Sequence, residues 1–187
     1  MQLARIIGIT GTNGSGKDTL GAILAQVNYR TVSLSDILRA EATKRRLPHT
    51  RENLSAISNE LRTAHGDDIL PKRIIEESPQ DEKLVITSIR TPGEVTVIQT
   101  YGGIVAWVDA DQRTRYERIK AAQRGRVDDE VTFEEFQHQE AAEMTPTKQG
   151  GNLNMSGARD LADITIRNDF PSKEAFEAHL RELFGLN

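Results

Sequence analysis

Apolar segments and amphipathic segments alternate along this chain. The first apolar segment, 5–10, reads as a buried strand, and after it Leu20, Ile23, Leu24 and Val27 recur at helical spacing. The same patterns predict strands at 4–10, 31–34, 84–89, 103–109 and 163–167, and helices at 17–27, 36–46, 51–65, 67–78, 92–101, 112–124, 133–144 and 172–185. Strands that alternate with helices favour a parallel sheet covered on both faces, so we expect an α/β fold.

Local signals support two of the predicted helices. Thr132 and Glu135 have the spacing of a capping box at the start of one of them. The last helix carries an apolar stripe, which consists of Phe176, Leu180, Leu183 and Phe184. Both signals concern the stability of the fold rather than its chemistry.

Two regions interrupt the simple alternation. Residues 36–78 form a helical insert between the second and third predicted strands, and residues 125–160 are polar and contain Gly150 and Gly151. We expect both to lie at the carboxyl ends of the strands, where open α/β sheets bind ligands. The second region is either a lid with a glycine hinge or an ordinary surface loop.

Length and composition restrict the class of protein. A chain of 187 residues predicts one domain, here 1–187, and 28% charged residues with a net charge of -4 give no global basic field for nucleic acid. The absence of cysteine excludes a disulfide framework, a thiolate metal site and a cysteine nucleophile. The first residues form no long apolar segment, so we expect a cytoplasmic protein without a membrane partner. We also expect a monomer or homodimer and no stable nucleic acid partner.

A glycine-rich stretch, 11–19, follows the first strand and leads into a helix. Gly11, Gly16 and Lys17 match the pattern G-x-x-x-x-G-K, whose backbone N–H groups and lysine bind the phosphates of a nucleotide. The residues expected to bind ATP are Asn13, Gly14, Ser15, Gly16, Lys17, Asp18 and Thr19. The alternative is a strand-to-helix turn that carries a lysine by chance.

The pattern departs from its usual form after the lysine. A hydroxyl residue usually follows there and contacts Mg²⁺, but this chain has Asp18 first and Thr19 next. We therefore assign Thr19 to the metal. Adenylate kinase and its relatives also place a non-hydroxyl residue after the lysine and a threonine next, so the departure resembles a kinase subtype.

Several segments resemble nucleotide kinases. Residues 34–41 look like the adenylate kinase segment that carries an acceptor-phosphate arginine, and 88–92 resemble that family's second such segment. Dephospho-CoA kinase-like proteins share segments at 50–54, 59–62, 89–90 with 93–95, and 162–163 leading to Asn168. Bacteriophage deoxynucleoside monophosphate kinases are similar at the Gly-Lys-Asp-Thr turn. The resemblance implies a three-layer α/β/α P-loop NTPase fold with a five-stranded parallel sheet, a helical acceptor-binding insert and a lid.

Arginines supply the expected charge for an acceptor. Arg39, Arg62 and Arg90 are the candidates for binding an acceptor phosphate, because a guanidinium group matches two phosphate oxygens at once. Of the arginines that flank the lid, we select Arg124 and Arg126 to neutralise charge during transfer. For each of them the alternative is a solvated surface charge.

Asp36 follows the second strand, as a catalytic aspartate does in dephospho-CoA kinase-like proteins. It is our candidate for orienting an acceptor hydroxyl and for holding the metal; alternatively Ser35 and Asp36 only cap a helix. Thr87 stands where similar sequences carry an acid. Either Asp36 or Asp18 takes over that role, or the metal is held less firmly and turnover is slow.

These features predict a kinase that uses ATP and Mg²⁺. The expected acceptor is a small nucleotide, first of all a nucleoside or deoxynucleoside monophosphate. The alternatives are a dephospho-CoA kinase, which phosphorylates a ribose hydroxyl, and a nucleotide-binding switch or adaptor that turns over no small molecule. The base of the acceptor is left open by the sequence.

Overall fold

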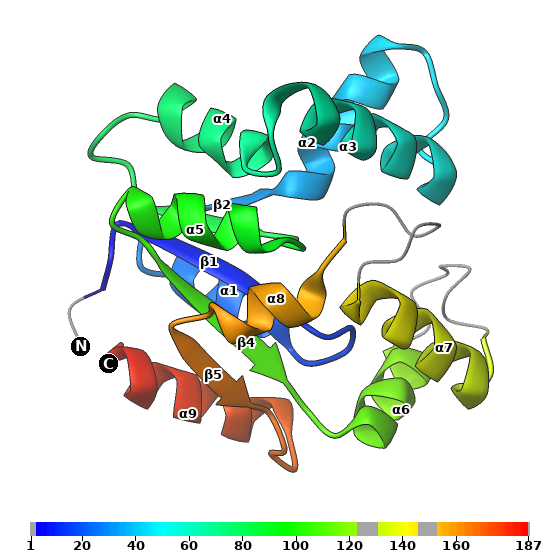
Figure 1. Cartoon of the computed structure of the whole chain (residues 1–187). Coiled ribbons are helices and arrows are strands. Elements are labelled where there is room, and N and C mark those ends of the chain that lie inside the picture. Colours follow the sequence, from blue (N-terminus) through cyan, green and yellow to red (C-terminus); the bar gives the residue numbers. More distant parts are fainter. Residues whose placement is uncertain (1–2, 123–130, 146–152, 187) are drawn as a thin grey trace.

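A parallel sheet forms the centre of the molecule (Figure 1). The computed structural model describes residues 3–122, 131–145 and 153–186, and within these the sheet has five strands in the order β2-β3-β1-β4-β5. All neighbouring strands pair in parallel. The strands are β1 (Ile6–Gly11), β2 (Arg30–Ser33), β3 (Leu84–Thr87), β4 (Ile104–Asp109) and β5 (Ile164–Arg167). The predicted α/β class is confirmed.

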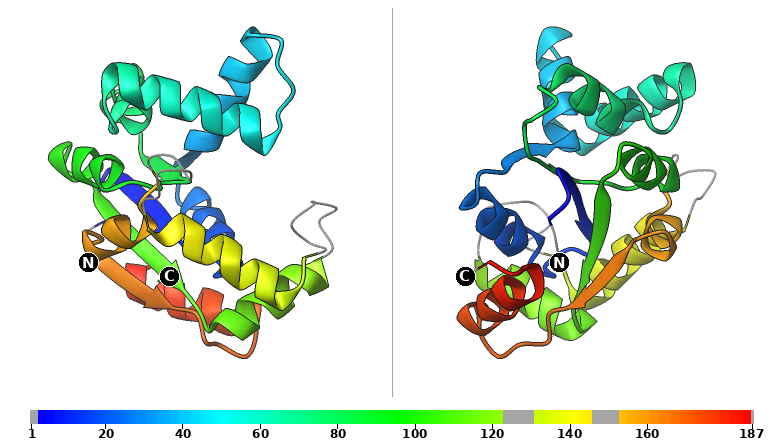
Figure 2. Two further views of the ribbon diagram at one scale, coloured as in Figure 1. Left: turned by 45° about the vertical axis from the view of Figure 1, so that its right-hand side comes forward. Right: turned by 90° about the vertical axis from the view of Figure 1, so that its left-hand side faces the viewer.

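Helices cover both faces of the sheet, and further helices lie beside it. They are α1 (Lys17–Ala25), α2 (Leu34–Lys44), α3 (Arg51–His65), α4 (Ile69–Glu77), α5 (Pro92–Thr100), α6 (Gln112–Ala122), α7 (Phe133–Met144), α8 (Met155–Asp160) and α9 (Lys173–Phe184). The right-hand view of Figure 2 shows α1 and α9 on one side of the sheet and α5 and α8 on the other. The protein therefore has three layers.

The alternation of side chains along β1 explains the two cores. Ile6 points to the core beneath α5 and α8, whereas Ile7 and Ile9 point to the core beneath α1 and α9. Gly8 lies between Ile7 and Ile9 along the strand. A Cβ atom on Gly8 would be only 2.8 Å from Ile89 Cδ1, so a larger residue does not fit there without a shift. The central strand is buried on both faces, which accounts for its uninterrupted apolar sequence.

Three helices, α2 to α4, connect β2 to β3 and lie together beside the sheet (Figure 1). The first of them begins at Leu34, and its N-cap is Ser33, whose hydroxyl accepts a hydrogen bond from the Ser35 backbone. The start is two residues earlier than expected, and neither Ser35 nor Asp36 is the cap. Asp36 instead lies in the first turn, where a negative charge complements the helix dipole.

The second interrupted region contains more helix than its polar sequence indicates. Thr132 and Glu135 form the predicted capping box at the start of α7. The short helix α8 was not predicted, because its six residues carry little periodic signal. Residues 123–130 and 146–152, which include Gly150 and Gly151, lie outside the described part of the chain. The predicted glycine hinge falls there.

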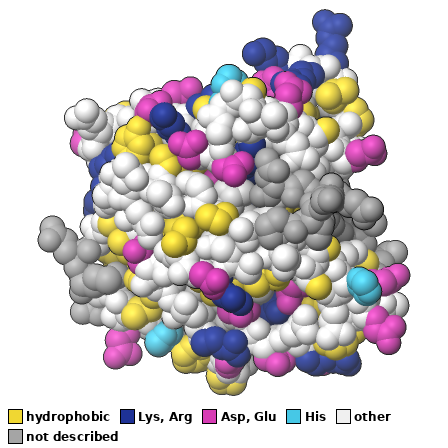
Figure 3. Space-filling view, in the orientation of Figure 1, with side chains coloured by type: hydrophobic (Ala, Val, Ile, Leu, Met, Phe, Trp, Pro, Cys, Tyr) yellow, Lys and Arg dark blue, Asp and Glu magenta, His cyan; other side chains and the backbone are white. Residues whose placement is uncertain are grey.

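Charged side chains of both signs are intermixed on the face shown in Figure 3. No helix among the described residues is long and apolar enough to cross a membrane.

Two leucines of α9 offer a matched test of the packing. Leu180 is fully buried in the core beneath α1 and α9, whereas Leu183, which the sequence placed on the same stripe, is 37% exposed. We expect Leu180→Ala to lower the free energy of unfolding by about 2–5 kcal/mol, because it leaves a cavity. Leu183→Ala should cost less than about 1 kcal/mol. Urea unfolding measures both values, and equal losses would contradict this packing.

Candidate active site

The glycine-rich loop, residues 11–16, joins β1 to α1 at the middle of the sheet. Its last residue, Gly16, is the N-cap of α1 with a φ of 99°, and no described side chain caps the helix there. A Cβ atom on Gly16 would lie 2.5 Å from Asn168 Nδ2, so a larger residue would displace the loop. A helix N-terminus without a side-chain cap favours an anion, because its first N–H groups and the helix dipole are both positive.

Neighbouring strands hold this loop in place. The Thr12 hydroxyl donates a 2.6 Å hydrogen bond to Asp109 Oδ1 at the end of β4. The Asn168 side chain, which follows β5, donates from Nδ2 to the Ser15 carbonyl oxygen at 2.8 Å. Because both partners extend from the sheet, the loop is positioned by the most rigid part of the fold.

Arg115 of α6 connects the loop to α7. Its buried guanidinium donates from Nη1 to the Asn13 carbonyl oxygen at 3.2 Å and pairs with Glu140 of α7, where Nη2 lies 2.9 Å from Oε1. The guanidinium carbon also lies 5.7 Å from the ring centre of Phe136. A single side chain therefore ties the loop to the helix above it.

The Lys17 ammonium group is folded back onto the loop, where Nζ donates to the Thr12 carbonyl oxygen. Burial lowers the pKa of Lys17 to about 8, and the neighbouring Asp18 opposes this shift. A desolvated ammonium group gains strongly from a nearby phosphate. This is the charge that a triphosphate tail would need.

A pocket of about 750 Å³ opens in front of the loop. It brings together residues of the glycine-rich loop, residues that follow β2 and β3, and residues of α6 and the segment after β5. Its lining includes Asn13, Gly14, Gly16, Lys17, Asp18, Thr19, Ser33, Ser35, Asp36, Arg39, Thr87, Ser88, Arg90, Arg118, Ile119, Asn168, Phe170, Pro171, Ser172, Lys173 and Phe176. The arrangement suits an elongated ligand with phosphates at its centre.

The side of the pocket that faces α2 contains most of the predicted acceptor residues. Asp36 and Arg39 are both exposed and form an ion pair in which Arg39 Nη1 lies 2.6 Å from Asp36 Oδ1. Arg90 follows β3, and its Nη1 lies 3.3 Å from Oε1 of Glu143 on α7. Two cations and a carboxylate thus lie in the same pocket as Lys17.

Arg62 is placed differently from what we expected. Its side chain is buried and pairs with Glu94, with Nη2 2.7 Å from Oε1, and it is not among the described residues that line the pocket. The expectation that Arg62 binds an acceptor phosphate does not fit this placement, because its guanidinium is already committed inside the protein.

The two catalytic arginines selected from the sequence, Arg124 and Arg126, lie outside the described residues. Arg118, one turn or more earlier on α6, does line the pocket. Its Nη2 donates to the carbonyl oxygens of Asn168, at 3.1 Å, and Phe170, at 3.3 Å. Arg118 therefore holds the segment after β5 against α6.

The donors available to Mg²⁺ are few. The Thr19 hydroxyl and the carboxylates of Asp18 and Asp36 all come from residues that line the pocket. The described residues contain no cluster of three or more His, Cys, Asp or Glu side chains that could hold a metal. Such a donor set fits Mg²⁺, which usually takes one or two protein ligands and completes its shell with phosphates and water.

The end of β3 is polar but uncharged. Thr87 lines the pocket where an acid was expected, and Ser88 follows with a φ of 65°, a left-handed conformation that is uncommon outside glycine. The hydroxyls of Ser88 and Ser33 share a hydrogen bond of 2.9 Å. The turn that leads from β3 to Arg90 is therefore held in a fixed shape.

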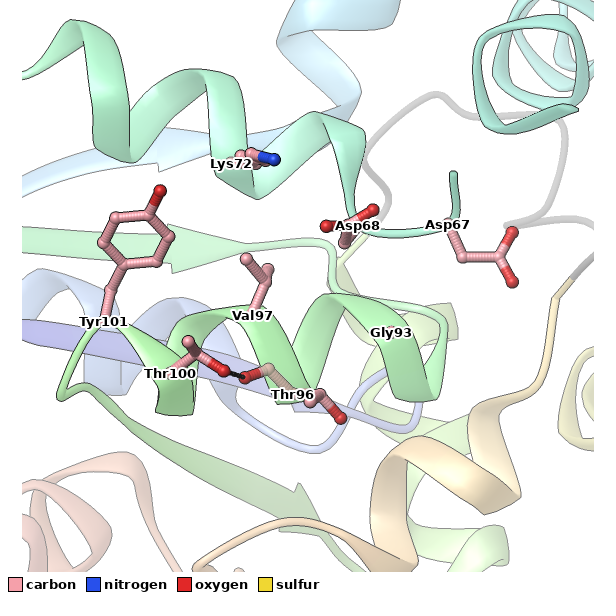
Figure 4. Close-up of a pocket in the computed structure, with 8 residues that line it drawn as sticks. All are labelled: Asp67, Asp68, Lys72, Gly93, Thr96, Val97, Thr100 and Tyr101. Atoms are coloured by element: carbon pink, nitrogen blue, oxygen red, sulfur yellow. Dashed lines mark hydrogen bonds between the residues drawn. The ribbon is translucent and has the colours of Figure 1, made fainter. Parts of the chain in front are cut away.

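A second pocket, of about 520 Å³, lies between α4 and α5 (Figure 4). Its described lining consists of Asp67, Asp68, Lys72, Gly93, Thr96, Val97, Thr100 and Tyr101. It includes none of the residues that the sequence singled out for chemistry. The candidate site is therefore the pocket in front of the glycine-rich loop.

The sequence did not predict that Asp109 and Arg115 hold this loop in place, and it marked Asn168 only as part of a shared segment. Asp109, Arg115 and Asn168 contact it from positions about 100 to 150 residues away, and no local pattern marks such contacts. Glu94 could have been found, because Thr91 and Glu94 have the capping-box spacing and form that box in the structure.

Comparison with known sequences shows which families the chain belongs to. A family model described as an AAA domain matches residues 10–134. A UPF0200 protein from Hyperthermus butylicus is 32% identical over 181 residues, which cover 95% of this chain and 92% of that protein. A UPF0200 protein from Methanocaldococcus jannaschii is 31% identical over 183 residues, which cover 95% and 86% respectively.

Solved structures share the fold at low sequence identity. Shikimate kinase from Bacteroides thetaiotaomicron has a TM-score of 0.59 at 16% identity, and the match covers 97% of this chain and 98% of that chain. Shikimate kinase from Acinetobacter baumannii in complex with shikimate has a TM-score of 0.58 at 14% identity, with 97% and 93% covered. The predicted P-loop kinase fold is confirmed.

We expect the lowered pKa of Lys17 to make ATP binding dependent on pH. Well below pH 8 the ammonium group is almost fully charged with and without ATP. Above the free-protein pKa of about 8, binding must take up a proton, because phosphates favour the charged form. We expect the affinity for ATP to fall by up to about tenfold per pH unit in that range.

Calorimetry in two buffers of different ionisation enthalpy measures this proton uptake. At about pH 9 ATP binding should take up a substantial fraction of one proton, and at about pH 7 Lys17 should contribute only about a tenth of a proton. Lys17→Met should lose both the affinity and the proton uptake at the higher pH. Equal proton uptake in Lys17→Met and in the unchanged protein would contradict this assignment.

Proposed function

We propose that this chain, which belongs to the AAA domain family and to the UPF0200 family, is a phosphotransferase that moves the terminal phosphate of ATP to a nucleotide-type acceptor. A nucleoside or deoxynucleoside monophosphate is our first choice of acceptor. The observation that carries the proposal is that Lys17 and the uncapped start of α1 share one pocket with Asp36, Arg39 and Arg90. Donor groups and acceptor groups are thus within one site.

On the donor side the chain supplies positive charge without supplying a nucleophile. The N–H groups at the start of α1 hold the phosphates of ATP, and Lys17 moves from the Thr12 carbonyl oxygen to the outer phosphates. Thr19 and Asp36 would hold Mg²⁺, and the metal would supply positive charge for the phosphate oxygens. These groups stabilise the charge that the transferred phosphoryl group carries.

On the acceptor side, Arg39 and Arg90 bind the phosphate already present on the substrate. In the free protein, Arg90 pairs with the carboxylate of Glu143, which is an anion. An acceptor phosphate takes the place of this carboxylate and offers two oxygens to the planar guanidinium group. One of the acceptor oxygens then forms a bond to the terminal phosphorus of ATP, while the bond from that phosphorus to the bridging oxygen breaks and ADP leaves.

The acceptor decides whether a base is needed. A phosphate acceptor is already ionised and gives up no proton, whereas a hydroxyl acceptor must transfer its proton to a base. Asp36 lines the pocket and is exposed, so it is the group that would receive that proton from dephospho-CoA. This alternative predicts a much larger role for Asp36.

A nucleotide-binding switch that phosphorylates no small molecule is the second candidate. The uncharged Thr87 at the end of β3 favours it, because one expected metal-binding acid is missing from the site. Positioning and charge neutralisation supply most of the catalysis in phosphoryl transfer, so the loss of one acid is compatible with a kinase.

An acceptor screen tests the proposal. The full chain is incubated with ATP and Mg²⁺ and with nucleoside monophosphates, their deoxy forms, dephospho-CoA and shikimate, and ADP is measured. We expect a nucleoside or deoxynucleoside monophosphate to stimulate ADP release, and Lys17→Met to abolish the stimulation. ATP binding without stimulation by any acceptor would contradict a kinase and support the switch.

Asp36→Asn separates the two kinds of acceptor. With a monophosphate acceptor we expect kcat to change by less than about tenfold, because no proton is removed and only a metal contact is weakened. With a hydroxyl acceptor the loss of a general base costs about a hundredfold to ten-thousandfold. Steady-state kinetics with the acceptor found in the screen gives the answer, and a loss in the second range would replace our first choice with a dephospho-CoA kinase.

A further inference from the structure

The Glu94 carboxylate controls the backbone of the turn that carries Arg90. Glu94 is completely buried at the start of α5, and its Oε2 accepts hydrogen bonds from the backbone N–H groups of Arg90, at 2.6 Å, and Thr91, at 3.2 Å. The Thr91 hydroxyl in turn accepts from the Glu94 backbone at 3.2 Å. The conformation at Arg90 therefore depends on where this carboxylate lies.

The other oxygen of the carboxylate is held by the helical insert. Glu94 Oε1 accepts a 2.7 Å hydrogen bond from Nη2 of Arg62, which lies on α3, and Arg62 also donates from Nη1 to the Ser58 hydroxyl. Arg62 is only 4% exposed. A continuous path of hydrogen bonds thus runs from α3 through Glu94 to the backbone of Arg90.

Helix packing alone does not require such a path. Burying two charges is costly, and an apolar pair of similar size often stabilises a protein as well or better. Burial raises the pKa of Glu94, and Arg62 together with the backbone N–H groups of Arg90 and Thr91 opposes that rise. Arg62 Nε is itself buried and without a hydrogen-bond partner among the described residues. The distinctive feature of this pair is that its hydrogen bonds lead to the backbone of Arg90, a residue that lines the pocket.

We propose that Arg62 is a positioning residue for the acceptor: through Glu94 it fixes the turn that directs Arg90 into the pocket. The inference rests on the proposed function, because it assigns Arg90 to the acceptor. It also gives Arg62 a role that its sequence position suggested only in part. Arg62 serves the acceptor site without touching the acceptor.

The test uses inorganic phosphate as the probe for Arg90. The full chain is first saturated with Mg²⁺ and a non-hydrolysable ATP analogue, so that the glycine-rich loop is filled, and phosphate is then titrated. Arg62→Met should weaken phosphate binding on the order of tenfold, while the affinity for the ATP analogue changes less than about twofold. Amide hydrogen exchange of Arg90 and Thr91 should accelerate, because the carboxylate no longer holds their N–H groups.

A second substitution shows whether Arg62 acts through Glu94. In Arg62→Met/Glu94→Gln, the neutral side-chain carbonyl accepts the two N–H groups without a buried charge, so phosphate affinity and amide exchange should return towards the unchanged values. Failure of this rescue would overturn the inference. Should Arg62→Met not fold, Arg62→Lys makes the same comparison, because it keeps the charge and loses the guanidinium fork.

Two controls test whether phosphate binds at Arg90 and whether the effect is specific to Arg62 rather than to α3 as a whole. Arg90→Gln should weaken phosphate binding, and adding Arg62→Met to it should have no further effect. Glu60→Gln removes the pair between Glu60 and Arg45, which joins α3 to α2, and it should leave phosphate affinity within about twofold. An equal loss in Glu60→Gln would mean that the insert as a whole, rather than Arg62, matters.

These measurements need no turnover. If the acceptor screen fails while phosphate affinity follows Arg62 and Glu94 as described, the kinase assignment falls and the positioning role of Arg62 remains. If the screen succeeds but Arg62→Met leaves phosphate affinity and amide exchange unchanged, only the positioning role is overturned.

Discussion

The structure depends on one constraint, which is that the glycine-rich loop must end at Gly16 in a left-handed conformation, with a φ of 99°, and start α1 without a side-chain cap among the described residues. A loop of this shape needs support from its surroundings. The Thr12 hydroxyl bond to Asp109 and the Asn168 bond to Ser15 fix the loop from two strands of the sheet. The sheet acts as a rigid frame, and the loop keeps a shape that favours an anion.

The same frame explains why the remaining charged residues converge. In a parallel sheet all carboxyl ends lie on one edge, so the residues that follow β1, β2 and β3 meet there. Lys17, Asp36 and Arg90 come from these three places and line one pocket. Their proximity follows from the strand order rather than from contacts among them.

Features that depend on local sequence could be predicted, whereas features that depend on contacts between distant residues could not. The loop, the strands and most helices have local signals, and Lys17 and Arg90 could be placed because each lies just beyond a strand. The burial of Arg62 depends on Glu94, which is 32 residues away, and the contact of Arg115 with the loop spans 102 residues. A helical arginine looks the same in sequence whether it faces water or a buried carboxylate, so such pairings become visible only in the folded chain.

One helix joins the two halves of the site by the same kind of long-range contact. Glu140 and Glu143 are three residues apart on α7 and therefore lie on one face of it. Glu140 pairs with Arg115, which holds the glycine-rich loop, and Glu143 pairs with Arg90 on the acceptor side. A phosphate that binds Arg90 competes with only the second of these pairs. Under the proposed function, the pair between Arg115 and Glu140 lies outside this exchange, so the link between the glycine-rich loop and α7 does not depend on what Arg90 binds.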